Sequence, residues 1–210
     1  TPPGVTKIEL EHNDDLKTDN VAYVSRPQEE KIRILLITND DAAFLKAALT
    51  SGGDVTLDTT KLPLIPDNTY DIYILHEINK KNIITGNIEQ LKSKVEQGAT
   101  IIIHAQRDLN SIDFKGLLPL SVSGRGGFAV LAQSQHTSFT KDIDFGSVAS
   151  YLTTQKEKGH SILTADNSSI IQYNTFGDGK VLYYGIMDDA NEFHFSPSYP
   201  LFWVNLIRFL

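Results

Sequence analysis

The segment KIRILLITND, residues 31–40, decides how this chain of 210 residues folds. Ile32 and the four residues 34–37 form a nearly continuous apolar run. Such a run is typical of a strand that is buried on both faces, as in a parallel sheet. Asn39, Asp40 or Asp41 directly after it can cap a helix. We therefore expect this segment to begin a β-α-β unit.

The residues downstream continue the same alternation of strands and helices. Helices are predicted where apolar residues recur at helical spacing and a glycine follows. These helices are DAAFLKAALTSGG at 41–53, including Phe44, Leu45, Ala48 and Leu49, and IEQLKSKVEQG at 88–98. Strands are predicted at 54–61, 70–78 and 99–106. The order indicates a mostly parallel α/β sheet with helices on both faces, in which 32–37, 71–75 and 100–104 are adjacent strands.

The second half of the chain has a different pattern. Strand-like segments occur at 148–154, 161–164, 169–175 and 180–186, with a tight turn at 176–179. They predict an antiparallel β extension of the parallel sheet. The glycine-rich residues 123–127 match neither a P-loop nor a dinucleotide fingerprint, so we expect a flexible loop. At the C-terminus, Ser198 should cap a helix with Pro200 in its first turn, packed on the sheet rather than inserted in a membrane.

Residues 1–27 form a separate N-terminal region. TKIELE at 6–11 and NVAYVS at 20–25 predict a β-hairpin, joined by an Asn- and Asp-rich turn at 12–20. Two strands alone are marginal in water, so we expect the hairpin either to pack on the main body or to be the end of an upstream β domain, which the family resemblance described below implies is a β-sandwich. The polar residues 26–30 are typical of a linker. We expect residues 31–210 to form the α/β domain. Because the chain does not start with Met, we expect a fragment of a longer protein.

Composition excludes several classes of function. The formal net charge is −7, and residues 1–30 account for −4 of it, so the basic surface that binds nucleic acid is not expected. The chain has no cysteine, which removes thiolate metal sites and a cysteine nucleophile. The six histidines have no metal-ligand spacing, although His76, Glu77 and His104 can meet in space. We predict no cofactor, no metal and no direct membrane insertion by this fragment.

The candidate site lies at the carboxyl ends of the predicted parallel strands, where open α/β sheets bind ligands. Polar residues at strand ends also cap helices and satisfy backbone groups, so this crevice is a hypothesis only. Its residues are His76, Glu77, His104, Gln106, Arg107, Asp108, Asp188 and His194.

The chain resembles the class I glutamine amidotransferase-like fold, which is flavodoxin-like. VEQGATIIIHAQ at 95–106 and FGDGKVLYYGI at 176–186 are similar to passages of the trehalose-utilisation-like branch. NDDLKTDNVAYV at 13–24 and SPSYPLFWVNLIRFL at 196–210 resemble segments of large membrane-anchored proteins related to the aerotolerance protein BatA. Those proteins contain a von Willebrand factor A domain, so the resemblance implies a membrane-anchored parent for this soluble fragment.

The departures from that family determine the functional hypothesis. The catalytic cysteine would fall near Gln106, Ser111 lacks a nucleophile-elbow pattern, and only His194 loosely matches the catalytic base. We therefore expect a non-catalytic binding or scaffolding domain, whose partner is another domain of the parent chain or a separate protein. The alternative is a site beside His104 and Glu77 that binds a small molecule or carbohydrate, or hydrolyses it, as the trehalose-utilisation-like resemblance implies.

Overall fold

A computed structural model describes residues 4–9, 21–26 and 31–210 of the chain. The chain divides after Lys31 into two compact units, each described here by itself. In the first unit, β1 (Gly4–Glu9) pairs antiparallel with β2 (Val21–Arg26). Ile8, Tyr23 and Val24 are each more than half exposed. The predicted turn at 12–20 and most of the predicted linker lie outside the described residues.

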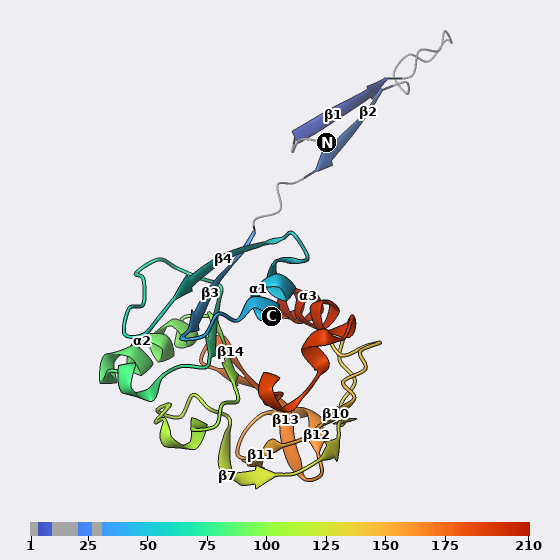
Figure 1. Cartoon of the computed structure of the whole chain (residues 1–210). Helices are drawn as coiled ribbons and strands as arrows, with labels where there is room; N and C mark the ends of the chain where they lie inside the picture. Colours follow the sequence, from blue (N-terminus) through green and yellow to red (C-terminus); the bar gives the residue numbers. More distant parts are fainter. Residues whose placement is uncertain (1–3, 10–20, 27–30) are drawn as a thin grey trace. The chain divides into compact units, whose positions relative to one another are not determined.

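The second unit is built on one eight-stranded mixed sheet (Figure 1). Five strands are parallel and lie in the order β4-β3-β5-β6-β14: Val55–Thr60, Ile32–Thr38, Ile72–His76, Thr100–His104 and Gly179–Tyr184. The sheet continues antiparallel through β13 (Ser168–Phe176), β12 (His160–Ala165) and β9 (Ala132–Gln133). The predicted adjacency of β3, β5 and β6 and the antiparallel extension are both confirmed.

Helices cover both faces of this sheet because successive strand residues point to opposite sides. Leu35 and Ile37 pack on the same side as α2 (Thr85–Glu96), whereas Ile34 and Leu36 pack toward α1 (Ala43–Thr50) and α3 (Ser198–Phe209). Figure 1 shows α2 on one side of the sheet and the other two helices opposite. The apolar run at 34–37 therefore supplies two hydrophobic cores at once.

The C-terminal helix belongs to the core of this unit, as predicted. Phe202 and Trp203 of α3 are both fully buried. None of the helices in the described part of the chain is both long and apolar enough to cross a bilayer.

The predicted helix caps are wrong in detail. α1 begins after Ala42, which has a positive φ of 51° and offers no side-chain cap, although Asn39, Asp40 and Asp41 precede it. α3 begins at Ser198, so the N-cap position is held by Pro197. The side chain of Ser196 instead accepts the Ser198 N–H. Polar residues alone did not identify the residue at which either helix begins.

The chain between β6 and β12, residues 105–159, is a long insertion that contains the remaining short strands. β7 (Leu120–Gly126) pairs with β11 (Tyr151–Lys156), and β8 (Ala129–Val130) pairs with β10 (Ser147–Val148). Short 3₁₀ helices occupy Lys80–Asn82, Leu109–Ser111, Asp188–Ala190 and Phe193–Phe195. The expected flexible loop at 123–127 is mostly strand β7. A β-carbon at Gly126 would lie 2.2 Å from the Tyr151 ring, so the glycine makes room for that side chain.

The packing of α2 against the start of β14 can be tested with paired glycine substitutions. A β-carbon at Gly179 would lie 2.2 Å from the backbone oxygens of Ala99 and Val95, which cannot move like a side chain. We expect Gly179→Ala to lower the free energy of unfolding by about 2 kcal/mol or more. Gly86→Ala meets no atom within 4 Å and lies in α2, so it should raise stability by up to about 1 kcal/mol. Urea unfolding of both variants checks the prediction, and equal effects would contradict it.

Candidate functional site at the carboxyl edge of the sheet

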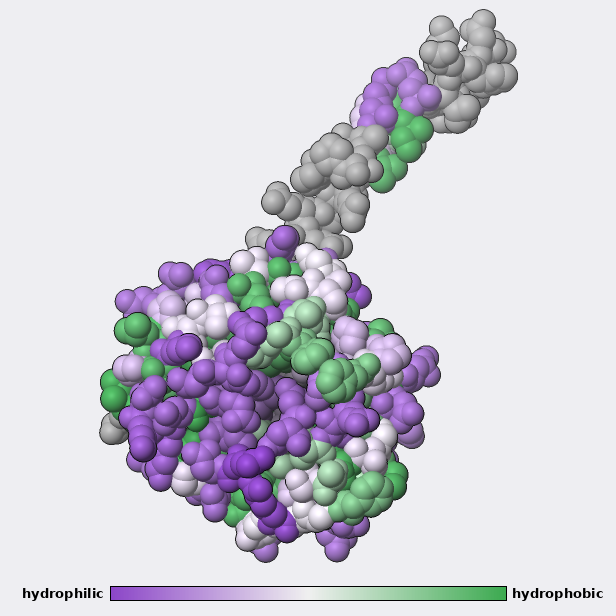
Figure 2. Space-filling model, viewed as in Figure 1, coloured by the Kyte–Doolittle hydropathy of each residue, from purple (hydrophilic) through white to green (hydrophobic). Residues whose placement is uncertain are grey.

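The carboxyl ends of four parallel strands meet around a pocket of about 500 Å³. In a sheet of this strand order, the crevice between the first and third strands, β3 and β5, is where ligands bind. Figure 2 shows that the surface of the second unit is hollowed near its middle and that the walls of this hollow are mainly hydrophilic. The pocket is lined by Asn39 and Asp40 after β3, His76 and Glu77 at the end of β5, Arg107 and Asp108 after β6, and Asp188 and Asp189 after β14.

Hydrogen bonds join the loop after β3 to the loop after β5, on either side of this crevice. The Asn39 N–H donates to the Glu77 carbonyl at 3.3 Å, and the Asn79 N–H donates to the Asn39 side-chain oxygen at 2.8 Å. Five of the residues predicted from sequence line the pocket: His76, Glu77, Arg107, Asp108 and Asp188. The structure therefore brings together residues from positions far apart in the sequence.

A second pocket of about 790 Å³ adjoins the first and shares Asp188 and Asp189 with it. His194 lines this second pocket, not the first. Its other walls come from the insertion, including Phe128 and Asp144, and from the loop that precedes α3, including Glu192 and Phe195. We call the two joined pockets the carboxyl-edge groove.

The carboxyl-edge groove concentrates the negative charge of this unit. Residues 32–210 contain fifteen Lys and Arg and nineteen Asp and Glu. The groove is lined by seven of the acids and one base, Arg107, which leaves fourteen bases and twelve acids elsewhere. Arg107 is already paired with Asp189. The seven acids are Asp40, Glu77, Asp108, Asp144, Asp188, Asp189 and Glu192.

Glu77 combines an unusual backbone conformation with crowded carboxylates. Its φ is 43°, in the left-handed region that few non-glycine residues adopt. Its side chain is exposed to the pocket, yet partial withdrawal from water raises its pKa. The negative charges of Asp189, Asp40 and Asp108 raise the pKa further, against the opposing effect of His76. Burial and the neighbouring carboxylates therefore both raise the pKa of Glu77 and favour its protonated form.

The two predicted histidines differ in their position relative to the pocket. His76 is 4 % exposed; its Nδ1 lies 3.2 Å from the Thr38 hydroxyl, and its Nε2 lies 3.7 Å from an Asp188 oxygen. His104 lies beneath the pocket, stacked on Trp203 with ring centroids 5.4 Å apart. Burial holds the pKa of His104 well below its usual range, and His76 lowers it further. His104 is therefore a neutral core residue.

Gln106 is buried at the position where the amidotransferase resemblance places the catalytic cysteine. Its side-chain oxygen accepts the Ile78 N–H at 3.0 Å, and its side-chain nitrogen donates to the Ile78 carbonyl at 2.9 Å. The same nitrogen donates to Asp108 at 2.6 Å. No residue from 104 to 112 has a positive φ, so the strained turn of a nucleophile elbow does not occur there. Gln106 therefore joins the loop after β5 to the loop after β6.

Exposed aromatic residues beside the groove were not predicted as site residues. Phe195 is 67 % and Phe128 72 % exposed, although both line the second pocket. Phe44 was expected on the buried face of α1 but is half-exposed, with its ring 5.1 Å from Phe195 and 4.9 Å from His194. The sequence FHF at 193–195 was the available signal, but it did not show which of its rings face solvent.

Metal binding has no support within the residues that the structure describes. No group of three or more His, Asp or Glu side chains among them has a geometry that could hold a metal ion. His76, Glu77 and His104, which the sequence left open as such a group, are not brought together as one in that part of the chain.

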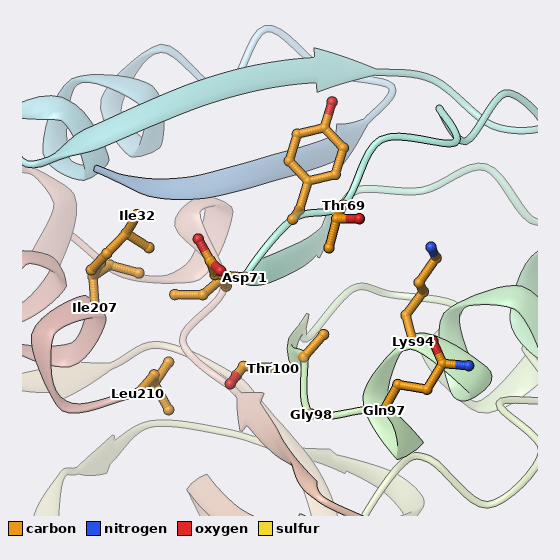
Figure 3. Close-up of a pocket in the computed structure, with 12 residues that line it drawn as sticks. Ile32, Thr69, Asp71, Lys94, Gln97, Gly98, Thr100, Ile207 and Leu210 are labelled. Atoms are coloured by element: carbon orange, nitrogen blue, oxygen red, sulfur yellow. The ribbon is translucent and has the colours of Figure 1, made fainter. Parts of the chain in front are cut away.

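A third pocket, of about 480 Å³, lies at the opposite, amino-terminal edge of the strands. Figure 3 shows Ile32, Ile207 and Leu210 on one side of it, across from Lys94 and Gln97. Its charged groups are Asp71, which accepts the Arg33 N–H, and Lys94. It lacks the concentration of carboxylates found in the carboxyl-edge groove. It also lies at the other ends of the strands, away from the crevice where sheets of this strand order bind ligands.

The role of Gln106 can be tested by comparison with an exposed glutamine. In Gln106→Ala the buried N–H and C=O of Ile78 lose their partners, so stability should fall by about 2 to 4 kcal/mol. Gln97→Ala removes the same amide from an exposed position and should change stability by less than about 0.5 kcal/mol. Denaturant titration measures both. Equal losses would show that Gln106 is not a structural clamp.

The raised pKa of Glu77 predicts a pH-dependent stability difference. Because the fold favours the protonated form, the charged form opposes folding above the folded-state pKa, and this effect disappears at lower pH. Glu77→Gln should therefore have a higher melting temperature than the unmodified protein at neutral pH. The difference between the two melting temperatures should narrow as the pH falls through that pKa. Glu157→Gln, an exposed glutamate outside the groove, is the control. A difference that stays constant with pH would contradict the assignment.

Residues 33–206 match the family described as "Domain of unknown function (DUF7408)". No curated protein sequence matches the chain. Among solved structures, the cytoplasmic protein STM1381 from Salmonella typhimurium LT2 aligns with a TM-score of 0.71 at 13 % identity, covering 85 % of this chain and 99 % of that one. PurLQS from Thermotoga maritima aligns at 0.56 and 14 %, covering 85 % and 99 %. The β-galactosidase from Rahnella sp. R3 aligns at 0.64 and 13 %, covering 85 % of this chain but 31 % of the enzyme. At these identities the likeness shows the fold alone.

Proposed function

Because the chain belongs to the DUF7408 family, whose description assigns no function, we propose from its geometry that residues 31–210 form a non-catalytic binding domain. The domain would bind another domain of its parent chain or a separate protein through the carboxyl-edge groove. The buried amide of Gln106 supports this proposal most strongly. It occupies the expected nucleophile position and uses both of its polar atoms to bond the backbone of Ile78.

The finer resemblance supports a scaffolding role within a larger protein. We propose that the domain descends from the trehalose-utilisation-like branch of the glutamine amidotransferase-like fold. Its parent would be a membrane-anchored protein with a von Willebrand factor A domain. The strand order β4-β3-β5-β6-β14 is also the flavodoxin-like order, which supports the fold part of this proposal. For the hairpin, the exposed Ile8, Tyr23 and Val24 favour a position at the end of an upstream β-sandwich, which would cover them.

The alternative is a small-molecule or carbohydrate ligand in the same groove. Its support is the pocket of about 500 Å³ beside Glu77, a size that suits small ligands. Glu77 has the raised pKa and backbone strain that occur at catalytic sites. However, the charged side chains that line the groove are seven carboxylates and Arg107, and Arg107 is paired with Asp189, so the groove favours a cationic partner over a neutral sugar.

Turnover assays on the purified chain separate these two functions. We expect no ammonia release from glutamine, because Gln106 occupies the nucleophile position after β6, and no nitrophenol release from nitrophenyl galactosides or mannosides. Saturable turnover that is lost in Glu77→Gln would establish the alternative and overturn the non-catalytic proposal.

The binding part of the proposal is tested by selecting ligands from a displayed library of random peptides. Amide chemical shifts then locate the bound peptides on the domain. We expect shifts at Asp188, Asp189 and Ala190 in the groove, and none at Gly98 and Thr100 in the amino-edge pocket. Peptides that shift only the amino-edge residues would show that the carboxyl-edge groove is not the binding site.

A further inference from the structure

We propose that the carboxyl-edge groove binds an extended, arginine-containing peptide segment whose apolar side chains rest on the exposed aromatic rings beside it. This inference rests on the proposed binding function and names the partner of the same site. It follows from the charge of the groove, its unpaired polar groups, its aromatic border and its elongated form.

Charge complementarity is the first argument. The groove contains seven of the nineteen carboxylates of residues 32–210, whereas the rest of that unit has more bases than acids. Like charges oppose one another, and after burial they are the second cause that raises the pKa of Glu77. A cationic partner removes the repulsion, so the groove selects positive charge.

The polar groups at the junction of the two pockets are incompletely bonded. His76 is 4 % exposed and lines the pocket, yet its Nε2 makes no hydrogen bond to any described residue. The nearest carboxylate oxygen, on Asp188, lies 3.7 Å away, beyond hydrogen-bond distance. With the proton on Nδ1, Nε2 and the Asp188 carboxylate form two neighbouring acceptors. A guanidinium, with several N–H donors in one plane, can donate to both.

The aromatic border favours arginine over other cations. Phe44, His194 and Phe195 form a packed ledge, with ring centroids 4.0 to 5.1 Å apart. Phe195 and Phe128 both line the groove, and about two-thirds or more of the surface of each is exposed. Guanidinium groups stack on aromatic faces as well as pairing with carboxylates, whereas an ammonium is more strongly hydrated. Exposed aromatics beside a charged groove are also typical of protein-binding surfaces.

The form of the groove favours a chain over a compact ion. Two pockets of about 790 and 500 Å³ join at Asp188 and Asp189, so a partner can place side chains in each. In the described part of the chain the acidic groups do not cluster into a metal-binding geometry. The acids line both pockets, which suits positive charges distributed along an extended segment.

The probe is a fluorescein-labelled peptide in which arginine alternates with leucine, and anisotropy measures its binding to the purified chain. We expect saturable binding that weakens as sodium chloride is raised. A peptide with lysine in place of arginine should bind more weakly. A peptide with glutamate in place of arginine should not bind. Unlabelled spermine, a polyamine without apolar side chains, should compete poorly.

Matched variants locate the interaction. The double variant Asp188→Asn/Glu192→Gln should weaken binding of the arginine peptide by about tenfold or more, since it removes two groove charges. Asp178→Asn/Glu157→Gln removes the same charge from exposed positions elsewhere and should change affinity by less than about twofold. Phe195→Ala should weaken binding, whereas Leu201→Ala, another half-exposed apolar residue, should not.

Each outcome has a definite meaning. Equal losses in the two double variants, equal binding of the glutamate peptide, or spermine competition as strong as the unlabelled peptide would overturn the inference. Library peptides that occupy the groove but lack basic residues would also overturn it, while leaving the proposed binding function intact. Substrate turnover would overturn the proposed function itself.

Discussion

Burial of β3, β5 and β6 on both faces is the constraint on which the rest of this unit depends. Leu35 and Ile37 need the cover of α2, whereas Ile34 and Leu36 need α1 and α3, so no helix can be omitted without exposing apolar strand residues. Parallel pairing also places the carboxyl ends of these strands at one edge. The polar residues that must follow each buried strand therefore collect at the same edge, and this produces a groove before any functional requirement is considered.

Gln106 has a structural role at the position where the amidotransferase resemblance places a nucleophile. A nucleophile after β6 would need a strained turn with its side chain exposed. Here the backbone from 104 to 112 stays in ordinary conformations, and the Gln106 amide bonds both polar groups of Ile78. The bonds hold the loop after β5 against the loop after β6. The strained backbone occurs instead at Glu77, on the opposite side of the same junction.

The parts of the fold that the sequence predicted are those with short-range signals. Continuous apolar runs identified β3, β5 and β6, and helical spacing identified α1, α2 and α3. The strand β7 was missed because Gly126 makes room for the ring of Tyr151, which pairs with it from 25 positions further along the chain. For the site, residues directly after strands were predicted. Asp144, Phe128 and the exposed ring of Phe44 were not, because the packing of the insertion places the first two beside the groove and the contact with Phe195 places the third.

The groove and the core are connected through the loop that precedes α3. Phe193 is buried against Phe145, Tyr199 and Phe202, while its neighbours Glu192 and Phe195 line the groove. The Ala149 N–H donates to the Ala190 carbonyl at 2.9 Å, and the Asn191 amide donates to the Ser147 carbonyl, which joins this loop to the insertion. Both walls of the second pocket are thus fixed by the packing of α3. A rigid groove loses little conformational entropy when a partner binds, so its charges and rings can act as a preorganised surface.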